Sequence, residues 1–310
     1  MPRSTLPLGV VAAALSNDLR AAPARARAAG FAGLQFDAYS SVLNIPDLSG
    51  SGRREFARLL AAQDQRLVGL RWDAGPKGLG PGADVDQALA RLERVMEAAA
   101  GLASPLVSVE LGPLPEPPAA PKPKPKVTRE QAGLILLPEG LGGGGAGAAG
   151  SATPQAAAGP APDPAFVSHV DGALAELCRR ADRYSVIVAL RSELASFAAL
   201  ERALRQVNCP WFGVDLDPVA VLRDPWDADE VFSRLGGFIC HVRGRDAIRG
   251  ADRRTKPAPV GSGSTDWGHL LSNLDEAGYA GWITVDPIEL TDRATAATQA
   301  REYLAKLLPR

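Results

Sequence analysis

The stretch "FICHVRGRDAIRG" (residues 238–250) joins an apolar run to a histidine, three arginines and an aspartate. Successive side chains of a strand point to opposite faces, so Cys240 and Val242 share one face, and His241, Arg243 and Arg245 share the other. An apolar face packed on helices and a charged face directed at a barrel axis would explain both sets. The stretch therefore predicts a barrel strand that ends in a charged loop.

Short apolar stretches of strand length recur along the whole chain. Further strands are expected at 8–15, 33–37, 67–73, 106–112, 185–191, 211–217 and 282–286. Helical patterns lie between them at 84–101, 166–184, 194–207, 227–237 and 266–279, and a last one follows at 294–308. Eight alternations of strand and helix, joined by short turns, predict one (β/α)8 TIM barrel over residues 1–310 rather than an open doubly wound sheet.

One segment, residues 113–164, breaks this alternation. It consists of a Pro/Lys tract (113–126), an apolar island "AGLILLPEG" (132–140) and a Gly/Ala tract (141–164). The two tracts bury too little apolar surface to stay ordered, so we expect a long disordered insert after the fourth strand. We interpret the Pro/Lys tract as a solvated linker, with a polyproline II ligand for a protein partner as the alternative. The apolar island is suited to docking on the barrel or on another chain.

Composition and charge limit the partners. The chain has 46% hydrophobic and 22% charged residues and a formal net charge of -1, which indicates neither a nucleic acid nor an anionic membrane. No stretch approaches the roughly 20 apolar residues of a membrane-spanning helix, and the run from Leu8 predicts a core strand rather than a signal peptide. Cys178, Cys209 and Cys240 are odd in number and far apart, which predicts neither a disulfide framework nor a zinc site. We therefore expect a reduced, cytoplasmic protein.

Charged side chains gather at the carboxyl ends of the predicted strands. With Phe212, Val214 and Leu216 facing the helices, Asp215 and Asp217 face the axis. The same alternation directs further polar residues inward: Gln35, Asp37, Arg71, Asp73, Glu110, Arg191, Glu193 and Asp286. Barrel active sites lie at this end, so the set predicts a ligand site. The alternative is a salt-bridge network that holds the barrel mouth together.

Several stretches resemble the xylose isomerase-like family of barrels, which includes sugar isomerases, sugar epimerases and the endonuclease IV branch of DNA repair. They are "AGFAGLQFD" (29–37), "FGVDLDP" (212–218), "HVRGRDAIRG" (241–250) and "PVGSGSTDWGHLLSNLDEAGYAGWITVD" (259–286). The resemblance covers most of the chain outside the insert, and the last two stretches are its most specific part.

The resemblance implies a divalent metal held by a Glu, an Asp, a His and a Glu on the fifth to eighth strands. By position, Asp217 keeps the Asp and Asp286 is a shortened carboxylate, whereas Arg191 replaces the Glu and Arg243 the His. The histidine that often follows the Asp by three residues is Ala220. Arginine offers a metal no lone pair and stays protonated, so we expect an Arg/Asp cluster and no metal. The alternative is one divalent metal held by Asp217, Asp286, Glu110 and His241.

In function, the resemblance implies a sugar or sugar-phosphate isomerase or epimerase acting on a small polar carbonyl substrate. In that chemistry a carboxylate base moves a proton next to the carbonyl, and a cation stabilises the enediolate. We expect the base among Glu110, Asp217 and Asp286, and the cation at Arg191 or Arg243. The residues predicted to bind substrate are Asp37, Arg71, His241, Arg245, Arg249, Gly261 and Gly263.

Two of these predictions depend on the loop after the seventh strand. Arg249 is followed by Gly250 and matches the family's substrate-contacting Arg-Gly step. The turn "VGSGSTD" (260–266) runs into a predicted helix, and its backbone amides are suited to an anion such as a phosphate. The alternative is that Gly261 and Gly263 serve only the turn, with Ser264 or Thr265 as the helix cap.

A second hypothesis is a catalytically silent barrel that binds an anionic ligand or a protein partner. It is motivated by the replaced metal ligands, by the basic loop "RGRDAIRGADRRTKP" (243–257) and by the insert. The endonuclease IV branch is excluded, because its multi-zinc site needs many histidines and this chain has only His169, His241 and His269.

Overall fold

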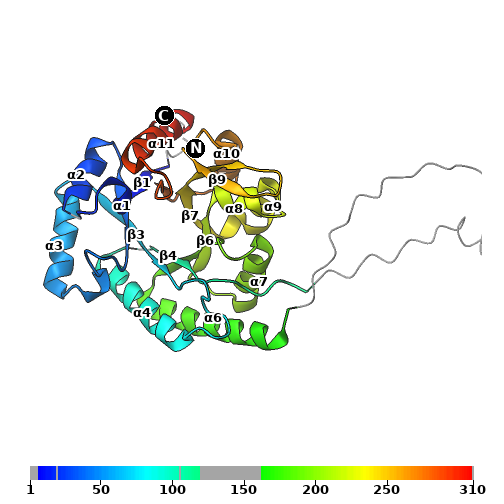
Figure 1. Cartoon of the computed structure of the whole chain (residues 1–310). Coiled ribbons are helices and arrows are strands. Elements are labelled where there is room, and N and C mark those ends of the chain that lie inside the picture. Colours follow the sequence, from blue (N-terminus) through cyan, green and yellow to red (C-terminus); the bar gives the residue numbers. More distant parts are fainter. Residues whose placement is uncertain (1–5, 19, 105, 119–161, 309–310) are drawn as a thin grey trace, which may run out of the picture.

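The chain folds into a closed barrel of parallel strands, in a computed structural model that describes residues 6–18, 20–104, 106–118 and 162–308. The strand order around the barrel is β1-β10-β7-β6-β5-β4-β3-β2, and the helices surround it (Figure 1). The barrel strands are β1 Leu8–Val11, β2 Gly33–Asp37, β3 Arg66–Asp73, β4 Leu106–Glu110, β5 Ile187–Leu190, β6 Phe212–Leu216, β7 Ile239–Gly244 and β10 Ile283–Val285. The predicted (β/α)8 barrel is confirmed.

The helices include the six that were predicted by residue range and four more, at 12–15, 21–28, 50–61 and 218–223, for which no range was predicted. They are α1 Ala12–Leu15, α2 Ala21–Ala28, α3 Gly50–Ala61, α4 Val85–Gly101, α6 Pro164–Tyr184, α7 Phe197–Val207, α8 Pro218–Arg223, α9 Ala228–Leu235, α10 Trp267–Glu276 and α11 Arg293–Leu307, with short 3-10 turns η1 Ile45–Asp47 and η2 Gly236–Phe238. Side chains that precede a helix fix many of these starts, because they accept a backbone N–H of the first turn. Ser196 does so for α7, Asp227 for α9 and Asp292 for α11.

The core lies between the barrel and its ring of helices. Val214, Leu216 and Val242 are fully buried there, as their outward alternation predicts. On the inner side, polar residues fill the barrel instead: Ser108, Asp215, His241 and Thr284 are all buried. Two residues further along four of the strands stand Glu110, Asp217, Arg243 and Asp286, so the charged layer lies directly above this buried polar layer.

Two segments differ from the predicted strands. The first strand ends at Val11, because Ala12–Leu15 turns into the short helix α1. The charged loop after β7 forms an antiparallel hairpin, β8 Asp246–Arg249 paired with β9 Thr255–Ala258. Strict alternation cannot reveal such a hairpin, because its strands carry charged residues and lie outside the barrel.

The insert leaves the barrel where it was predicted, between β4, which ends at Glu110, and α6, which begins at Pro164. Residues 119–161, and with them the predictions for the apolar island and most of both tracts, lie outside the described residues. Over the part of the chain that is described, no helix is both long enough and apolar enough to cross a membrane.

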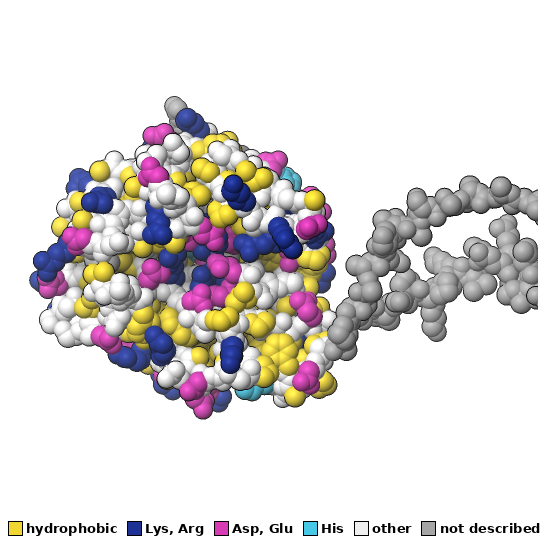
Figure 2. Space-filling view, viewed as in Figure 1, with side chains coloured by type: hydrophobic (Ala, Val, Ile, Leu, Met, Phe, Trp, Pro, Cys, Tyr) yellow, Lys and Arg dark blue, Asp and Glu magenta, His cyan; other side chains and the backbone are white. Residues whose placement is uncertain are grey.

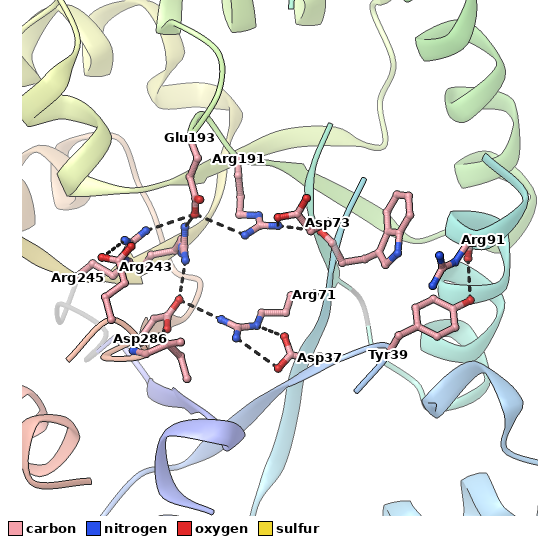
Figure 3. A pocket seen from close by; sticks show the side chains of 13 residues that line it. Asp37, Tyr39, Arg71, Asp73, Arg91, Arg191, Glu193, Arg243, Arg245 and Asp286 are labelled. Carbon is pink, nitrogen blue, oxygen red and sulfur yellow. Dashed lines mark hydrogen bonds and ion pairs between the residues drawn. The ribbon is translucent and has the colours of Figure 1, made fainter. Parts of the chain in front are cut away.

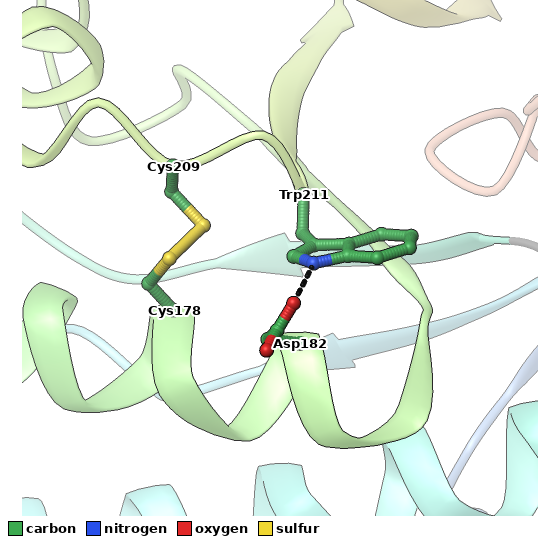
Figure 4. Close-up of a disulfide and its surroundings, with 4 residues drawn as sticks. All are labelled: Cys178, Asp182, Cys209 and Trp211. Atoms are coloured by element: carbon green, nitrogen blue, oxygen red, sulfur yellow. Dashed lines mark hydrogen bonds between the residues drawn. A yellow bond between two sulfur atoms is a disulfide. The ribbon is translucent and has the colours of Figure 1, made fainter.

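The prediction that the cysteines form no disulfide is wrong for one pair. Cys178 in α6 and Cys209 before β6 form a disulfide, although 31 residues separate them (Figure 4). They meet because α6 and α7 pack together and the turn after α7 returns the chain to the end of α6. Beside it, Trp211 Nε1 donates to Asp182 Oδ1 over 2.7 Å. Disulfides persist mainly in oxidising compartments. The expectation of a reducing cytosol was based on the predicted lack of a disulfide, and the Cys178–Cys209 bond removes that basis.

Candidate active site

A pocket of about 370 Å³ opens at the carboxyl ends of the strands. This volume is at the small end of the range for ligand pockets, roughly 300–1,000 Å³. Acidic and basic side chains gather there in the middle of the barrel face (Figure 2). The pocket is lined by Asp37, Tyr39, Arg71, Trp72, Asp73, Arg91, Arg191, Glu193, Arg243, Arg245, Asp286, Ile288 and Glu289 (Figure 3).

Arg243, at the end of β7, is bonded to three carboxylates. Its Nη1 donates to Asp217 over 3.2 Å and to Glu193, and its Nη2 donates to Asp286 over 2.6 Å. Burial opposes the charge, but the attraction of Asp217, Asp286 and Glu193 outweighs it and holds the pKa of Arg243 well above its ordinary value. The guanidinium is therefore a fixed cation in the centre of a carboxylate cluster.

Arg71 and Arg245 extend this network to both sides. Arg71 Nη1 donates to Asp286 over 3.0 Å, and its Nε donates to Asp37. Arg245 Nη1 donates to Asp217 over 2.7 Å, and its Nη2 lies 2.6 Å from Glu289. The chain of ion pairs thus runs across the pocket, from β2 to the loop after β10 (Figure 3).

Arg191 is less well compensated than its neighbours. Its Nη2 donates to the carbonyl oxygen of Trp72 over 2.8 Å, and its contacts with Asp73 and Glu193 are longer, at 3.7 and 3.5 Å. Its buried Nε has no hydrogen-bond partner. Burial and the nearby charge of Arg243 lower the pKa of Arg191. Arg191 therefore keeps donor capacity that the protein does not use.

Two carboxylates of the pocket, Asp286 and Glu193, have lowered pKa values. Burial raises the pKa of Asp286, but Arg243 and Arg71 outweigh it and the net pKa is far below the ordinary value. For Glu193 burial is likewise outweighed, by Arg243 and Arg191, and the pKa is lowered. Five arginines and five carboxylates line the pocket, and the buried Asp217 lies beneath them, so the site carries no excess of positive charge.

Glu110 was predicted as a candidate base, but it does not line the pocket. Its two carboxylate oxygens accept the backbone N–H groups of Gly112 and Glu193, both over 3.0 Å. Burial raises its pKa to about 7, against the opposing effect of Arg191. Glu110 therefore ties the chain after β4 to the chain after β5 and has no contact with the pocket.

His241 was predicted to contact substrate, and the structure places it one layer too deep. It is fully buried. Its Nδ1 lies 2.7 Å from Asp215, which also accepts a hydrogen bond from Ser108, and its Nε2 lies 2.8 Å from Thr284. All the polar atoms of the ring are thus engaged within the barrel interior, below Arg243.

These positions bear on the metal that the family resemblance implies. Glu110 and His241 are turned to other partners, and Arg243 lies among the remaining carboxylates. A cation placed there would meet a guanidinium group, which repels it and offers no lone pair. Among the described residues, no group of three or more His, Cys, Asp or Glu side chains is arranged to hold a metal ion. The residues present do not fit a divalent metal.

The glycine-rich turn predicted to hold an anion is filled by the protein itself. The buried carboxylate of Asp246 accepts the backbone N–H groups of Gly261, Gly263 and Thr265 over 3.0, 3.2 and 3.1 Å. A Cβ atom on Gly263 would lie 2.1 Å from that carboxylate. Gly263 therefore leaves room for the approach of Asp246, and the N–H groups of Gly261 and Gly263, which were predicted to bind substrate, are bonded to this carboxylate of the chain itself.

Arg249 is also absent from the pocket. It lies on β8, is exposed, and lines a separate cleft with Trp226 and His269. The hairpin places Arg249 outside the charged pocket, at the separate cleft. The other predicted substrate-binding residues, Asp37, Arg71 and Arg245, all line the pocket.

Seven lining residues were assigned no catalytic or substrate-binding role from the sequence: Tyr39, Trp72, Asp73, Arg91, Glu193, Ile288 and Glu289. Alternation places Asp73 and Glu193 inward, but nothing in the sequence singles them out as members of the ion-pair network. Tyr39, Trp72, Arg91 and Glu289 also line the pocket. Tyr39 and Glu289 follow strand ends in loops and Arg91 comes from α4, so strand alternation carries no signal for them.

Comparisons with known proteins agree with the barrel fold. The model of the xylose isomerase-like TIM barrel family matches residues 23–307. A search of curated proteins found no match. Among solved structures, the chain is similar to a xylose isomerase domain protein from Planctomyces limnophilus, with a TM-score of 0.71, 16% identity and 98% of each chain covered.

Two further solved structures have a similar fold. A xylose isomerase-like TIM barrel protein from Mycobacterium smegmatis, in complex with magnesium, has a TM-score of 0.68 at 15% identity, covering 98% of this chain and 96% of that one. The 3-keto-D-glucoside 4-epimerase from E. coli has a TM-score of 0.65 at 14% identity, covering 97% and 99%. At these identities the likeness establishes the fold alone.

Proposed function

Because the chain belongs to the xylose isomerase-like TIM barrel family, we propose that its pocket takes a small, neutral, polyhydroxylated carbonyl compound of the sugar class and moves a proton on it without a divalent metal. The observation that carries this proposal is the position of Arg243. Its guanidinium is bonded to Asp217, Glu193 and Asp286, and it supplies a permanent positive charge at the centre of the carboxylates.

A neutral ligand fits the charge of the pocket better than a phosphorylated one. Five arginines and five carboxylates line it, so an added phosphate would compete with carboxylates already paired to the guanidinium groups. The glycine-rich turn, the other candidate for a phosphate, is filled by Asp246. Hydroxyl groups, in contrast, both donate and accept. Trp72 and Tyr39 add aromatic surface for the apolar face of a sugar ring.

The arrangement suggests roles for the groups that face the ligand. Glu193, with 29% of its side chain exposed, takes a proton from the carbon next to the carbonyl. The electron pair moves onto the carbonyl oxygen, and the donors of Arg191 stabilise the enediolate oxygen. Return of the proton to the former carbonyl carbon, while the hydroxyl proton of the first carbon moves to the old carbonyl oxygen, gives isomerisation. Delivery of a proton from water to the opposite face of the first carbon, while Glu193 releases its own proton to water, gives epimerisation.

A second candidate is a barrel that binds the same ligand and does not transform it. One observation favours it: Glu193 is bonded to Arg243, and the arginines lower its pKa. A carboxylate held in ion pairs is a weak base. The binding of a neutral sugar is common to both candidates, and only turnover separates them.

The test is a panel of aldoses, ketoses and their phosphates, all with a chelator present. Binding is measured by calorimetry, and proton transfer by exchange of the substrate C–H for deuterium in NMR spectra. We expect neutral ketoses to bind, the phosphates to bind more weakly, and Glu193→Gln to lose exchange by about 100-fold or more while retaining binding. Glu230→Gln, on the outer helix α9, is the matched control.

The outcomes separate the candidates. Binding without exchange in the unaltered protein would leave the second candidate. Failure of every sugar to bind, or activity that appears only when a divalent metal is added, would overturn the proposal.

A further inference from the structure

The charged pocket continues on the side of β1 and β2. A second cleft of about 320 Å³ shares Asp37 with it, so this residue borders both clefts. The second cleft carries no arginine: its polar lining consists of Asp37 and the small side chains of Ser16, Asn17, Ser40 and Ser41. Hydroxyl and amide groups of this kind suit an uncharged, hydroxylated part of a ligand.

Beyond the second cleft the surface becomes apolar. A third cleft of about 590 Å³ shares Val42 and Leu43 with the second one. Its wall is made by Leu48, Phe56 and Leu59, where η1 is followed by α3. Two acidic and two basic residues stand at its edge, Asp18, Glu55, Arg20 and Arg58, so their charges cancel and do not call for a charged ligand group.

A single loop, residues 39–43, connects all three clefts. Tyr39 lines the charged pocket, Ser40 to Leu43 line the second cleft, and Val42 and Leu43 line the third. Ser40 holds the loop in shape: its backbone N–H donates to the carbonyl oxygen of Leu43 over 3.1 Å, and its Oγ accepts the Leu43 N–H over 3.0 Å. At the tip, Val42 is 60% exposed. Together with Leu43, Leu48, Phe56 and Leu59, Val42 forms a contiguous apolar lining of the third cleft.

We propose that the ligand is a glycoside, whose sugar ring lies in the charged pocket and whose apolar aglycone lies across Val42 in the third cleft. This inference rests on the proposed function and deepens it, since it names a substrate class larger than a free sugar. The order of the lining, from ion pairs through hydroxyl groups to aliphatic side chains, matches a molecule that is polar at one end and apolar at the other. The second cleft takes the glycosidic linkage.

The experiment compares ligands that share one sugar and differ in the aglycone. Free hexoses and their methyl, hexyl and phenyl glycosides are titrated into the full-length protein by calorimetry. We expect the hexyl and phenyl glycosides to bind roughly tenfold more tightly than the methyl glycoside. Val42→Asp should abolish that difference and leave the affinity for the free hexose unchanged.

The matched control is Ile248→Asp. Ile248 is 53% exposed on β8 and lines none of the three clefts, so this variant should keep the preference for the apolar glycosides. Equal affinities for all members of the series, or a preference that survives Val42→Asp, would overturn the inference and leave the proposed function intact. Absence of binding by every sugar and glycoside would remove both.

Discussion

The Nη2 atom of Arg243 lies 2.6 Å from a carboxylate oxygen of Asp286, across the neighbouring strands β7 and β10. Both side chains are almost completely buried, at 8 and 5% exposure. The family resemblance implies a metal ligand at each of these two positions. Here the same two strand ends carry a cation and an anion that neutralise each other.

Arg243 should be necessary for stability. Arg243→Met leaves the buried Asp286 without its main counter-charge and removes one of the two arginines bonded to Asp217. The free energy of unfolding should therefore fall by about 3–5 kcal/mol, measured by urea unfolding at pH 7. Arg249→Met, an exposed arginine outside the pocket, should change it by less than about 0.5 kcal/mol. A loss below about 1 kcal/mol in Arg243→Met would show that the cluster does not depend on this guanidinium.

Glu110 should make the stability of the protein depend on pH near neutrality. Its pKa is raised from 4.5 to about 7 by burial, so between these values the folded state holds a proton that the unfolded state has lost. The contribution of Glu110 to the free energy of unfolding is therefore fully present below pH 4.5 and decreases as the pH rises to 7. At about 1.4 kcal/mol per pH unit, the total loss is about 3 kcal/mol. Glu110→Gln, which does not titrate, should flatten the curve over this window.

Urea unfolding measured at intervals from pH 5 to pH 7.5 tests this dependence. The lowered pKa values of Asp286 and Glu193 act elsewhere: the stability that they contribute is present above the ordinary carboxyl range and is lost below it. Equal slopes in the two proteins between pH 5 and 7 would contradict the role assigned to Glu110.

Asp246 should act as an internal anion. Asp246→Ala leaves the N–H groups of Gly261, Gly263 and Thr265 without their acceptor, and each buried unpaired group costs about 1–3 kcal/mol. Thermal unfolding should therefore show a strong loss of stability, which added phosphate or acetate partly restores. The unaltered protein should not respond to either anion. An equal response of both proteins would mean that the turn is open to external anions.

The disulfide should stabilise the barrel without affecting the pocket. Replacing Cys178 and Cys209 by serine should lower the free energy of unfolding by about 2–4 kcal/mol and leave ligand affinity unchanged, because the bond joins outer elements (Figure 4). Alkylation of the denatured, unreduced protein should label Cys240 alone, as seen by mass spectrometry. Labelling of all three cysteines would contradict the bond.

Much of the barrel could be predicted from the sequence, because buried parallel strands leave a clear apolar pattern. Alternation also gave the correct face for Arg243, Asp217 and Asp286. It could not give their depth: His241 and Glu110 point inward as predicted, yet His241 lies a layer below the pocket and Glu110 is bonded to backbone amides. Height along the barrel axis depends on the register between strands, which no local pattern encodes.

The remaining errors come from contacts between distant segments. Cys178 and Cys209 meet only because α6 and α7 pack together, and a spacing of 31 residues gives no sign of that. The family resemblance implies that Arg249 contacts substrate, but Arg249 lies outside the pocket. The hairpin β8–β9 redirects it, and the anchor of that hairpin, Asp246, occupies the turn that was predicted to hold a phosphate.

The measurement that tests the account most directly is the binding of divalent metal to the purified protein. Mn²⁺ and Mg²⁺ are titrated into chelator-treated samples of the unaltered protein and of the double variant Arg191→Glu, Arg243→His, which restores the ligand types that the resemblance implies. We predict no tight binding to the unaltered protein and a gain of binding in the double variant. A tightly held, stoichiometric divalent ion in the unaltered protein would contradict the claim that Arg243 takes the place of the metal.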